Sequence, residues 1–122
     1  MCILDALILN TDRHLGNFGV LVENDTQRVL SMAPVYDNNR SLLFDLDTDQ
    51  LQNIRWCTEK CSPRIGTDFI TTARGMMTDE IRALLYPLRE FCFTPHPRIQ
   101  VEEERLSRLS KIIRTQVERI LS

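Results

Sequence analysis

The chain has 122 residues, of which 43% are hydrophobic and 26% are charged, and its net charge is −2. This length predicts one domain, residues 1–122, large enough to bury a core without disulfide or metal support. The arginines are dispersed and the net charge is small, so the sequence predicts no basic surface that would bind nucleic acid. No apolar stretch has the length of a membrane span or the pattern of a signal peptide. We therefore expect a cytoplasmic globular protein that binds neither nucleic acid nor membrane directly.

The first third of the chain predicts a buried helix, a polar loop and a β-hairpin. Residues 2–9 are apolar except for Asp5, which favours a buried helix over an equally buried strand. The polar loop 10–17 follows this helix. Residues 18–33 then contain two short apolar runs joined by turn residues, which predict a hairpin packed near the loop. Asp37 comes just beyond the hairpin, on a second loop.

The rest of the chain predicts helices. Residues 41–75 have an irregular pattern that defines no element. Thr78 and the two acids after it form a typical helix start, and Pro87 must kink or end that helix. Apolar residues on one face of 100–121, interrupted at Gln116, predict a long core helix. The fold class expected is α+β, mainly α, with one β-hairpin.

The two loops carry the residue types that phosphoryl transfer needs. This reaction requires a carboxylate to orient the attacking hydroxyl and oxygen ligands to hold magnesium on the nucleotide phosphates. In protein kinases the catalytic Asp and a magnesium-binding Asn stand five apart, and a second magnesium-binding Asp follows one hairpin later. Asp12, Asn17 and Asp37 have this order and spacing.

The spacing assigns a role to each of these residues. Asp12 would accept or orient the proton of the substrate hydroxyl, while Asn17 and Asp37 would bind magnesium. Arg13 and His14 would pair with phosphate or hold the loop. Polar loop residues often only cap helices and bond turns, but two motifs in the correct order favour a catalytic site.

These residues resemble a known family. Residues 10–18, NTDRHLGNF, and residues 33–37, APVYD, resemble the catalytic loop and metal-binding segment of HipA-type serine/threonine kinases, and secondarily those of phosphatidylinositol kinases. The resemblance implies the C-terminal lobe of a protein-kinase-like fold that uses ATP and Mg²⁺ to phosphorylate a Ser or Thr of a protein substrate. It also implies a cytoplasmic bacterial protein, often in a toxin–antitoxin pair with a DNA-binding antitoxin.

The features of an ATP-binding lobe do not precede the loop. Only eleven residues lie before Asp12, the four glycines form no phosphate-cradling cluster, and the two lysines, Lys60 and Lys111, lie downstream. We therefore expect a chain without the N-terminal ATP-binding lobe: a fragment, a truncated product or half of a split kinase. Such a chain would have little activity alone, and its exposed apolar surface would favour self-association.

Two other functions stay open at this point. A non-catalytic, kinase-like module would bind a partner, such as an antitoxin-like protein or the missing N-terminal lobe, and the absent lysine and glycine loop favour it. A lipid (phosphoinositide) kinase lobe fits the Asp-Arg-His sequence, but no basic membrane-facing patch supports it.

The cysteines offer a separate hypothesis, a structural zinc site. Cys57 and Cys61 have ligand-like spacing, and so do Cys92 and His96. Cysteines that fill helix faces show the same spacing, and a domain of this size needs no metal to fold. The sequence therefore favours free thiols over zinc.

Overall fold

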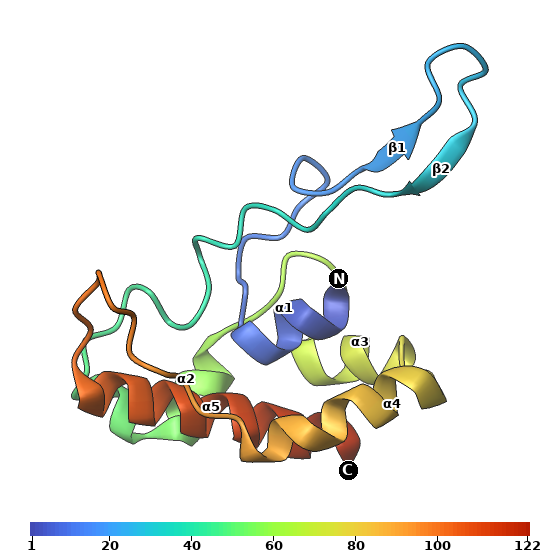
Figure 1. Cartoon of the computed structure of the whole chain (residues 1–122). Coiled ribbons are helices and arrows are strands. Elements are labelled where there is room, and N and C mark those ends of the chain that lie inside the picture. The colour runs from blue at the N-terminus through green and yellow to red at the C-terminus, as the bar shows by residue number, and fades with distance from the viewer.

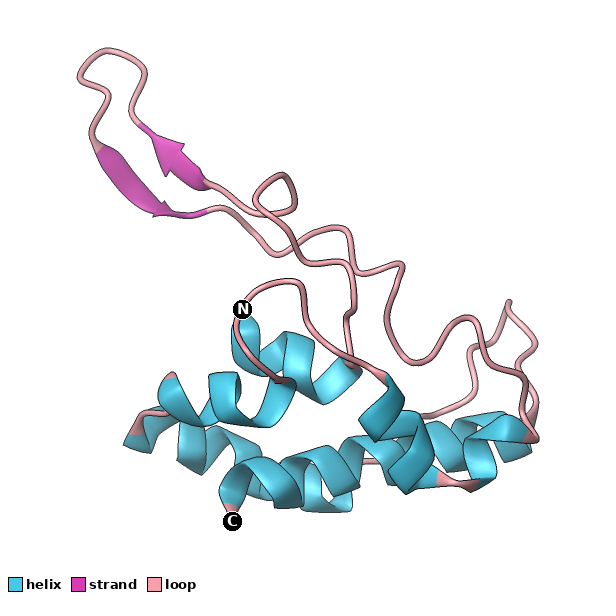
Figure 2. Cartoon of the chain, turned by 180° about the vertical axis from the view of Figure 1, so that it is seen from behind, coloured by secondary structure: helices cyan, strands magenta, loops and turns pink.

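The computed structural model describes residues 1–122 as a helical body from which one β-hairpin projects (Figure 1). In chain order the elements are α1 (Cys2–Ile8), β1 (Val20–Val22), β2 (Val29–Met32), the 3-10 helix η1 (Gln50–Gln52), α2 (Ile54–Lys60), α3 (Phe69–Gly75), α4 (Asp79–Leu85), the 3-10 helix η2 (Tyr86–Glu90) and α5 (Glu103–Leu121). Figure 2 shows that the strands are confined to the projecting hairpin. The coarse class, α+β and mainly helical with one antiparallel hairpin, is confirmed.

The N-terminal apolar run forms a helix, as expected. Ala6 and Leu7 of α1 are buried, and α1 packs against α3 and α5. The helix ends at Ile8, and the Leu9 that follows has a left-handed backbone with φ of 53°. This turn redirects the chain into the polar loop.

The β-hairpin is present, but it does not pack near the loop as the sequence suggested. Val20 lies opposite Met32 in an antiparallel register, and every residue of both strands is exposed. The strands extend away from the helices in both ribbon views (Figures 1 and 2). The alternating pattern predicts that the two strands pair, but it carries no information about what covers the faces of the ribbon.

The irregular region 41–75 contains η1, α2 and α3. Asn53 caps α2 by accepting a hydrogen bond from the Trp56 backbone N–H at 3.0 Å, and Asp68 caps α3 by accepting one from Thr71 N–H at 2.9 Å. Neither α-helix exceeds seven residues. Such short helices complete less than two turns, so their apolar spacing is hard to distinguish from an irregular pattern.

The helix expected after Thr78 is α4. The Thr78 hydroxyl accepts a hydrogen bond from Ile81 N–H at 3.2 Å, which confirms the predicted cap. The α-helix ends at Leu85, and the chain tightens into η2 with Pro87 in its first turn. This confirms that Pro87 ends the regular helix, because proline cannot donate the backbone hydrogen bond that would continue it.

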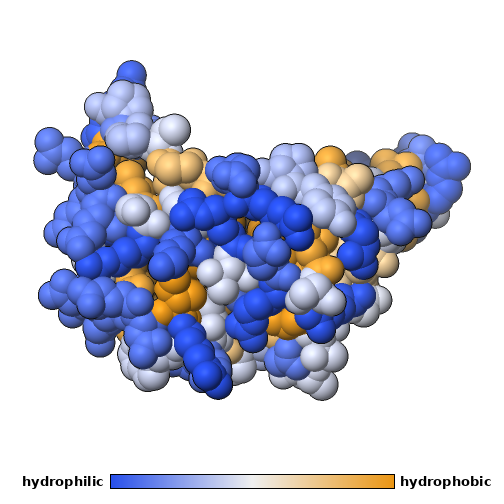
Figure 3. All heavy atoms as spheres, turned by 90° about the horizontal axis from the view of Figure 1, so that it is seen from below, coloured by the Kyte–Doolittle hydropathy of each residue, from blue (hydrophilic) through white to orange (hydrophobic).

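The longest helix, α5, begins at Glu103, slightly later than predicted, and forms one wall of the core. Its buried residues are Leu109, Ser110, Ile112, Ile113, Gln116, Val117 and Ile120. Gln116 does not interrupt the packed face, because its side-chain amide donates to the Ala6 carbonyl at 2.7 Å. Seen from below, the surface shows separate apolar patches among hydrophilic side chains (Figure 3). No helix, α5 included, combines the length and the apolar character needed to cross a membrane.

Candidate active site

The polar loop begins at the end of α1 and is bonded to it. Asn10 is fully buried, and its backbone N–H donates to the Asp5 carbonyl at 2.9 Å. The Asn10 side-chain oxygen accepts a hydrogen bond from Asp12 N–H at 3.1 Å, which closes a tight turn. The position of Asp12 is thus set by the helix that precedes it.

Arg13 forms a buried ion pair with Asp5. The side chain of Arg13 is only 2% exposed, and its Nη2 and Nε atoms donate to the Asp5 carboxylate at 2.9 and 3.0 Å. Asn10 Nδ2 donates to the same carboxylate at 3.2 Å. The hydrogen bonds to Asp5 raise the pKa of Arg13 above its usual value. A buried charge needs such a partner, so Asp5 and Arg13 stabilise each other.

Arg13 also connects the two predicted loops. Its Nη1 donates to the backbone carbonyls of Asn17 at 2.9 Å and of Tyr36 at 2.6 Å, and its Nη2 donates to Asn38 Oδ1 at 2.5 Å. The end of the first loop and both neighbours of Asp37 are therefore bonded to one guanidinium. This arrangement places the segments of Asp12, Asn17 and Asp37 side by side.

Asp37 has an unusual backbone conformation. Its φ is 56°, in the left-handed region, and its side chain is exposed. The preceding residue is held a second time, because the Tyr36 hydroxyl donates to the Gly16 carbonyl at 3.0 Å. Aspartate adopts this region more readily than most residues, and Leu9, Gln27, Leu42 and Leu43 also have positive φ. The hydrogen bonds from Arg13 to Tyr36 and Asn38, on either side of Asp37, hold it in this conformation.

Asn17 is buried and uses its side-chain nitrogen within the loop. The residue is 5% exposed, and its Nδ2 donates to the Asp12 carbonyl at 2.8 Å. Because the nitrogen is used within the loop, the oxygen is the side-chain atom left for a cation. Magnesium prefers oxygen ligands, so an Asn oxygen and the Asp37 carboxylate suit it chemically.

The Asp12 carboxylate faces two arginines from outside the loop. Arg64 Nη1 lies 2.8 Å from Asp12 Oδ1, and Arg40 Nε lies 3.9 Å from Oδ2. The hydrogen bond from Arg64 lowers the pKa of Asp12 below its usual value, with a smaller contribution from Arg40. Asp12 is therefore ionised at neutral pH and engaged by cations in this structure.

His14 braces the loop. Its Nδ1 accepts a hydrogen bond from Gly16 N–H at 3.0 Å. A side chain at position 16 would begin about 3.0 Å from His14 Cε1, which is tighter than ordinary contact. The imidazole thus has a local partner in the tight turn between Asp12 and Asn17.

The four residues of the zinc hypothesis lie in different environments. Cys57 is buried in α2 with its thiol against the Gln50 carbonyl, Cys61 is partly buried, and Cys92 is exposed. His96 Nδ1 accepts a hydrogen bond from its own segment. Nowhere in the chain do three or more His, Cys, Asp or Glu side chains gather as metal ligands. All four cysteines are free, and burial raises the pKa of the Cys57 and Cys61 thiols.

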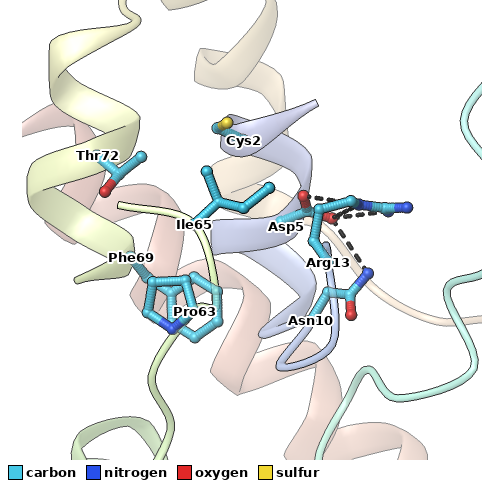
Figure 4. A pocket seen from close by; sticks show the side chains of 8 residues that line it. All are labelled: Cys2, Asp5, Asn10, Arg13, Pro63, Ile65, Phe69 and Thr72. Carbon is cyan, nitrogen blue, oxygen red and sulfur yellow. Dashed lines mark hydrogen bonds and ion pairs between the residues drawn. The ribbon is translucent and has the colours of Figure 1, made fainter. Parts of the chain in front are cut away.

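A small cavity lies behind the ion pair (Figure 4). Its volume is about 10 Å³, and its lining includes Asp5, Arg13, Pro63, Ile65 and Phe69. This is the space of a single water molecule, so it is too small for a substrate. The cavity marks the contact between the loop before α3 and the loop of Asp12.

Three charged residues of the site were not predicted from the sequence: Asp5, Arg40 and Arg64. Asp5 had a signal, since a lone acid in an apolar helix must find a buried partner. Arg40 and Arg64 had none, because exposed arginines are common and their distance from Asp12 in sequence is 28 and 52 residues.

The loop of Asp12 and Asn17 and the segment of Asp37 meet at Arg13, while the hairpin between them projects away from the helices (Figure 1). In comparisons with known proteins, the chain matches no protein-family model, no curated protein and no solved structure.

Proposed function

We propose that this chain is the C-terminal portion of a HipA-like protein kinase, which transfers the γ-phosphoryl group of ATP to a Ser or Thr of a protein. The observation that carries the proposal is the convergence of the Asn17 and Tyr36 carbonyls on one nitrogen of Arg13. Two motifs separated by a hairpin are thereby held together, as a shared metal and phosphate site requires. In this proposal Asp12 orients the substrate hydroxyl and accepts its proton.

Asn17 and Asp37 would hold Mg²⁺ in this proposal. Bound Mg²⁺ would neutralise charge on the nucleotide phosphates. The donor set fits a hard cation, because it offers an amide oxygen and a carboxylate, with phosphate oxygens and water left to complete the shell. The hydrogen bonds from Arg13 to Tyr36 and Asn38, on both sides of Asp37, support a residue held in place for binding.

Paramagnetic Mn²⁺, which accepts the same oxygen ligands as Mg²⁺, tests the metal site in the chain alone. We expect substoichiometric Mn²⁺ to broaden the backbone amide NMR signals around Asn17 and Asp37 first. Asp37→Ala should remove this selective broadening, because it deletes the only carboxylate ligand. Asp25→Ala, which removes an exposed acid at the hairpin tip, should leave it unchanged.

The surface lined by Asp47, Asp49 and residues 102–104 is acidic and provides a comparison region in the same spectra. Broadening confined to that surface, with none at Asn17 and Asp37, would contradict the metal site. Equal broadening in Asp37→Ala and in the unchanged chain would contradict it as well.

The proposed function also predicts the activity of the chain alone and the molecules that it binds. Because the resemblance implies an ATP-binding lobe ahead of the catalytic loop, we expect the chain by itself to have little or no kinase activity. The partners would be a protein substrate, the N-terminal lobe and, by the same resemblance, an antitoxin-like DNA-binding protein in the cytoplasm.

A second candidate function, a non-catalytic binding module, is favoured by the projecting hairpin. Both strands are exposed on both faces, with Val29 60%, Leu30 56% and Met32 54% accessible. A two-stranded ribbon is marginally stable alone, and its open edges can pair with another strand. The hairpin would therefore bind a partner chain or a second copy of this chain.

Self-association through the hairpin has a direct test. We expect Val29→Lys combined with Leu30→Lys to shift the chain toward monomer in light scattering coupled to gel filtration, because charge at an edge strand opposes pairing. Leu84→Lys on α4, which alters an apolar side chain that is 73% exposed, is the matched control. Equal masses for the hairpin variant and the control would contradict association through the hairpin.

A further inference from the structure

Two guanidinium groups from separate segments meet at Asp12. Arg64 comes from the loop between α2 and α3, and Arg40 comes from the segment after Asp37. Each faces a different oxygen of the Asp12 carboxylate, at 2.8 and 3.9 Å. Two positive charges thus face the single negative charge of the Asp12 carboxylate.

Arg64 is held in place by its neighbours. Pro63 and Ile65 both face the small cavity beside α1, so the backbone on each side of Arg64 is anchored to the helical body (Figure 4). Gly66 has φ of 91°, and a Cβ there would lie 2.2 Å from the Thr72 hydroxyl oxygen. The loop is therefore pressed against α3, and Arg64 extends from it toward Asp12.

Arg40 is tied to the Asp12 loop directly. Its backbone carbonyl accepts a hydrogen bond from Thr11 N–H at 3.1 Å, one residue before Asp12. Its guanidinium carbon lies 5.8 Å from the centre of the Phe44 ring. Two different anchors, the loop backbone and an aromatic face, keep this cation near the carboxylate.

Both guanidiniums remain open to solvent. The side chains of Arg64 and Arg40 are 56% and 59% exposed, so an incoming anion can reach them. The lysines do not offer an alternative here, since Lys60 lies near Asp45 and over Trp56, and Lys111 is on α5. Arginine is also well suited to phosphate, because its fork donates two hydrogen bonds in one plane.

We propose that Arg40 and Arg64 form a phosphate-binding pair that takes the terminal phosphate of a phosphorylated ligand, with Asp12 as the internal anion that occupies the pair until the ligand arrives. This inference rests on the proposed function and names the cations of its phosphate site. Phosphate binding would release the Asp12 carboxylate from the arginines and leave it free to orient a hydroxyl. The phosphate source would be a nucleotide or a phosphorylated side chain, which share this chemistry.

Arginine Nε–Hε NMR signals measure this binding without any kinase assay. Inorganic phosphate, titrated at neutral pH and constant ionic strength against chloride, should shift the Arg64 and Arg40 signals with one common dissociation constant. Arg55, an exposed arginine paired with Glu59, should not follow that curve. Arg64→Ala should weaken binding roughly tenfold, the effect of losing a charge-assisted hydrogen bond.

Asp12→Asn tests whether the Asp12 carboxylate competes with phosphate for the two arginines. It removes the internal competitor, so phosphate should bind several-fold more tightly than to the unchanged chain. Asp25→Asn makes the same change in net charge at the hairpin tip and should leave the affinity unchanged. A non-hydrolysable ATP analogue and a phosphoserine peptide, titrated in parallel, identify the source by which of them binds more tightly than phosphate.

Three results would overturn the pair: similar shifts at all exposed arginines, an unchanged affinity in Arg64→Ala, or equal affinities in Asp12→Asn and Asp25→Asn. The proposed kinase function is judged separately, by Mn²⁺ binding at Asn17 and Asp37. Phosphate binding without selective Mn²⁺ broadening would support the arginine pair and contradict the metal site. Selective Mn²⁺ broadening without phosphate binding would support the metal site and contradict the arginine pair.

Discussion

Replacing Asp5 with alanine is expected to lower the free energy of unfolding by about 3 kcal/mol, as measured by urea denaturation. The change leaves the guanidinium of Arg13, 2% exposed, without its carboxylate. Breaking a buried ion pair from one side costs roughly 3–5 kcal/mol. We expect the lower end, because Arg13 keeps its bonds to the Asn17 and Tyr36 carbonyls.

Two controls separate this effect from general loss of charge. Arg55→Ala breaks an exposed pair with Glu59 and should leave the free energy of unfolding unchanged within error. Asp5→Leu combined with Arg13→Met should recover much of the stability lost in Asp5→Ala, because no buried charge remains. A cost in Asp5→Ala as small as in Arg55→Ala would show that the buried pair does not stabilise the fold.

The double variant also tests whether the pair organises the site. Arg13→Met removes the shared donor of the Asn17 and Tyr36 carbonyls, so the two loops lose their common anchor. The variant should therefore be folded yet lose selective Mn²⁺ broadening. This result would show that apolar residues at positions 5 and 13 preserve the stability of the core but not the arrangement of the two loops.

Under the proposed kinase function, Asp12→Asn is expected to lower the rate of phosphoryl transfer by roughly 10²–10⁴-fold, the contribution of a positioned acid–base group. The measurement uses a protein in which this chain follows an ATP-binding lobe, with transfer of labelled phosphate to protein as the readout. Asparagine keeps the size of the side chain but cannot accept the hydroxyl proton. The loss should therefore appear in kcat.

The control for this variant is Asp25→Asn, which should keep the full rate. Asp37→Ala should abolish Mg²⁺-dependent turnover by removing the carboxylate ligand. Equal rates for Asp12→Asn and the unchanged protein would contradict the mechanism, even if metal and phosphate binding were both observed. If Asp12→Asn loses activity but keeps the selective Mn²⁺ broadening, Asp12 acts in the chemical step and not in metal binding.

Much of the local structure could be predicted from the sequence. The helix at the N-terminus, the hairpin, the Thr78 cap, the effect of Pro87 and the long final helix all depend on residues close in the chain. Hydrophobic spacing, caps and turn residues act over one to four positions, and the sequence displays them directly. The short helices of region 41–75 were not predicted, because a helix of seven residues gives too weak a hydrophobic pattern to recognise.

The sequence by itself determined the candidate residues of the proposed phosphoryl-transfer site, which are Asp12, Asn17 and Asp37 at their spacing around a hairpin. Only the tertiary structure decided how they are held and what faces them. Arg13, predicted as a phosphate or loop contact, is buried against Asp5 and joins both loops. Arg64 reaches Asp12 across 52 residues. Such pairings follow from how helices pack and where loops are anchored, and no local pattern encodes them.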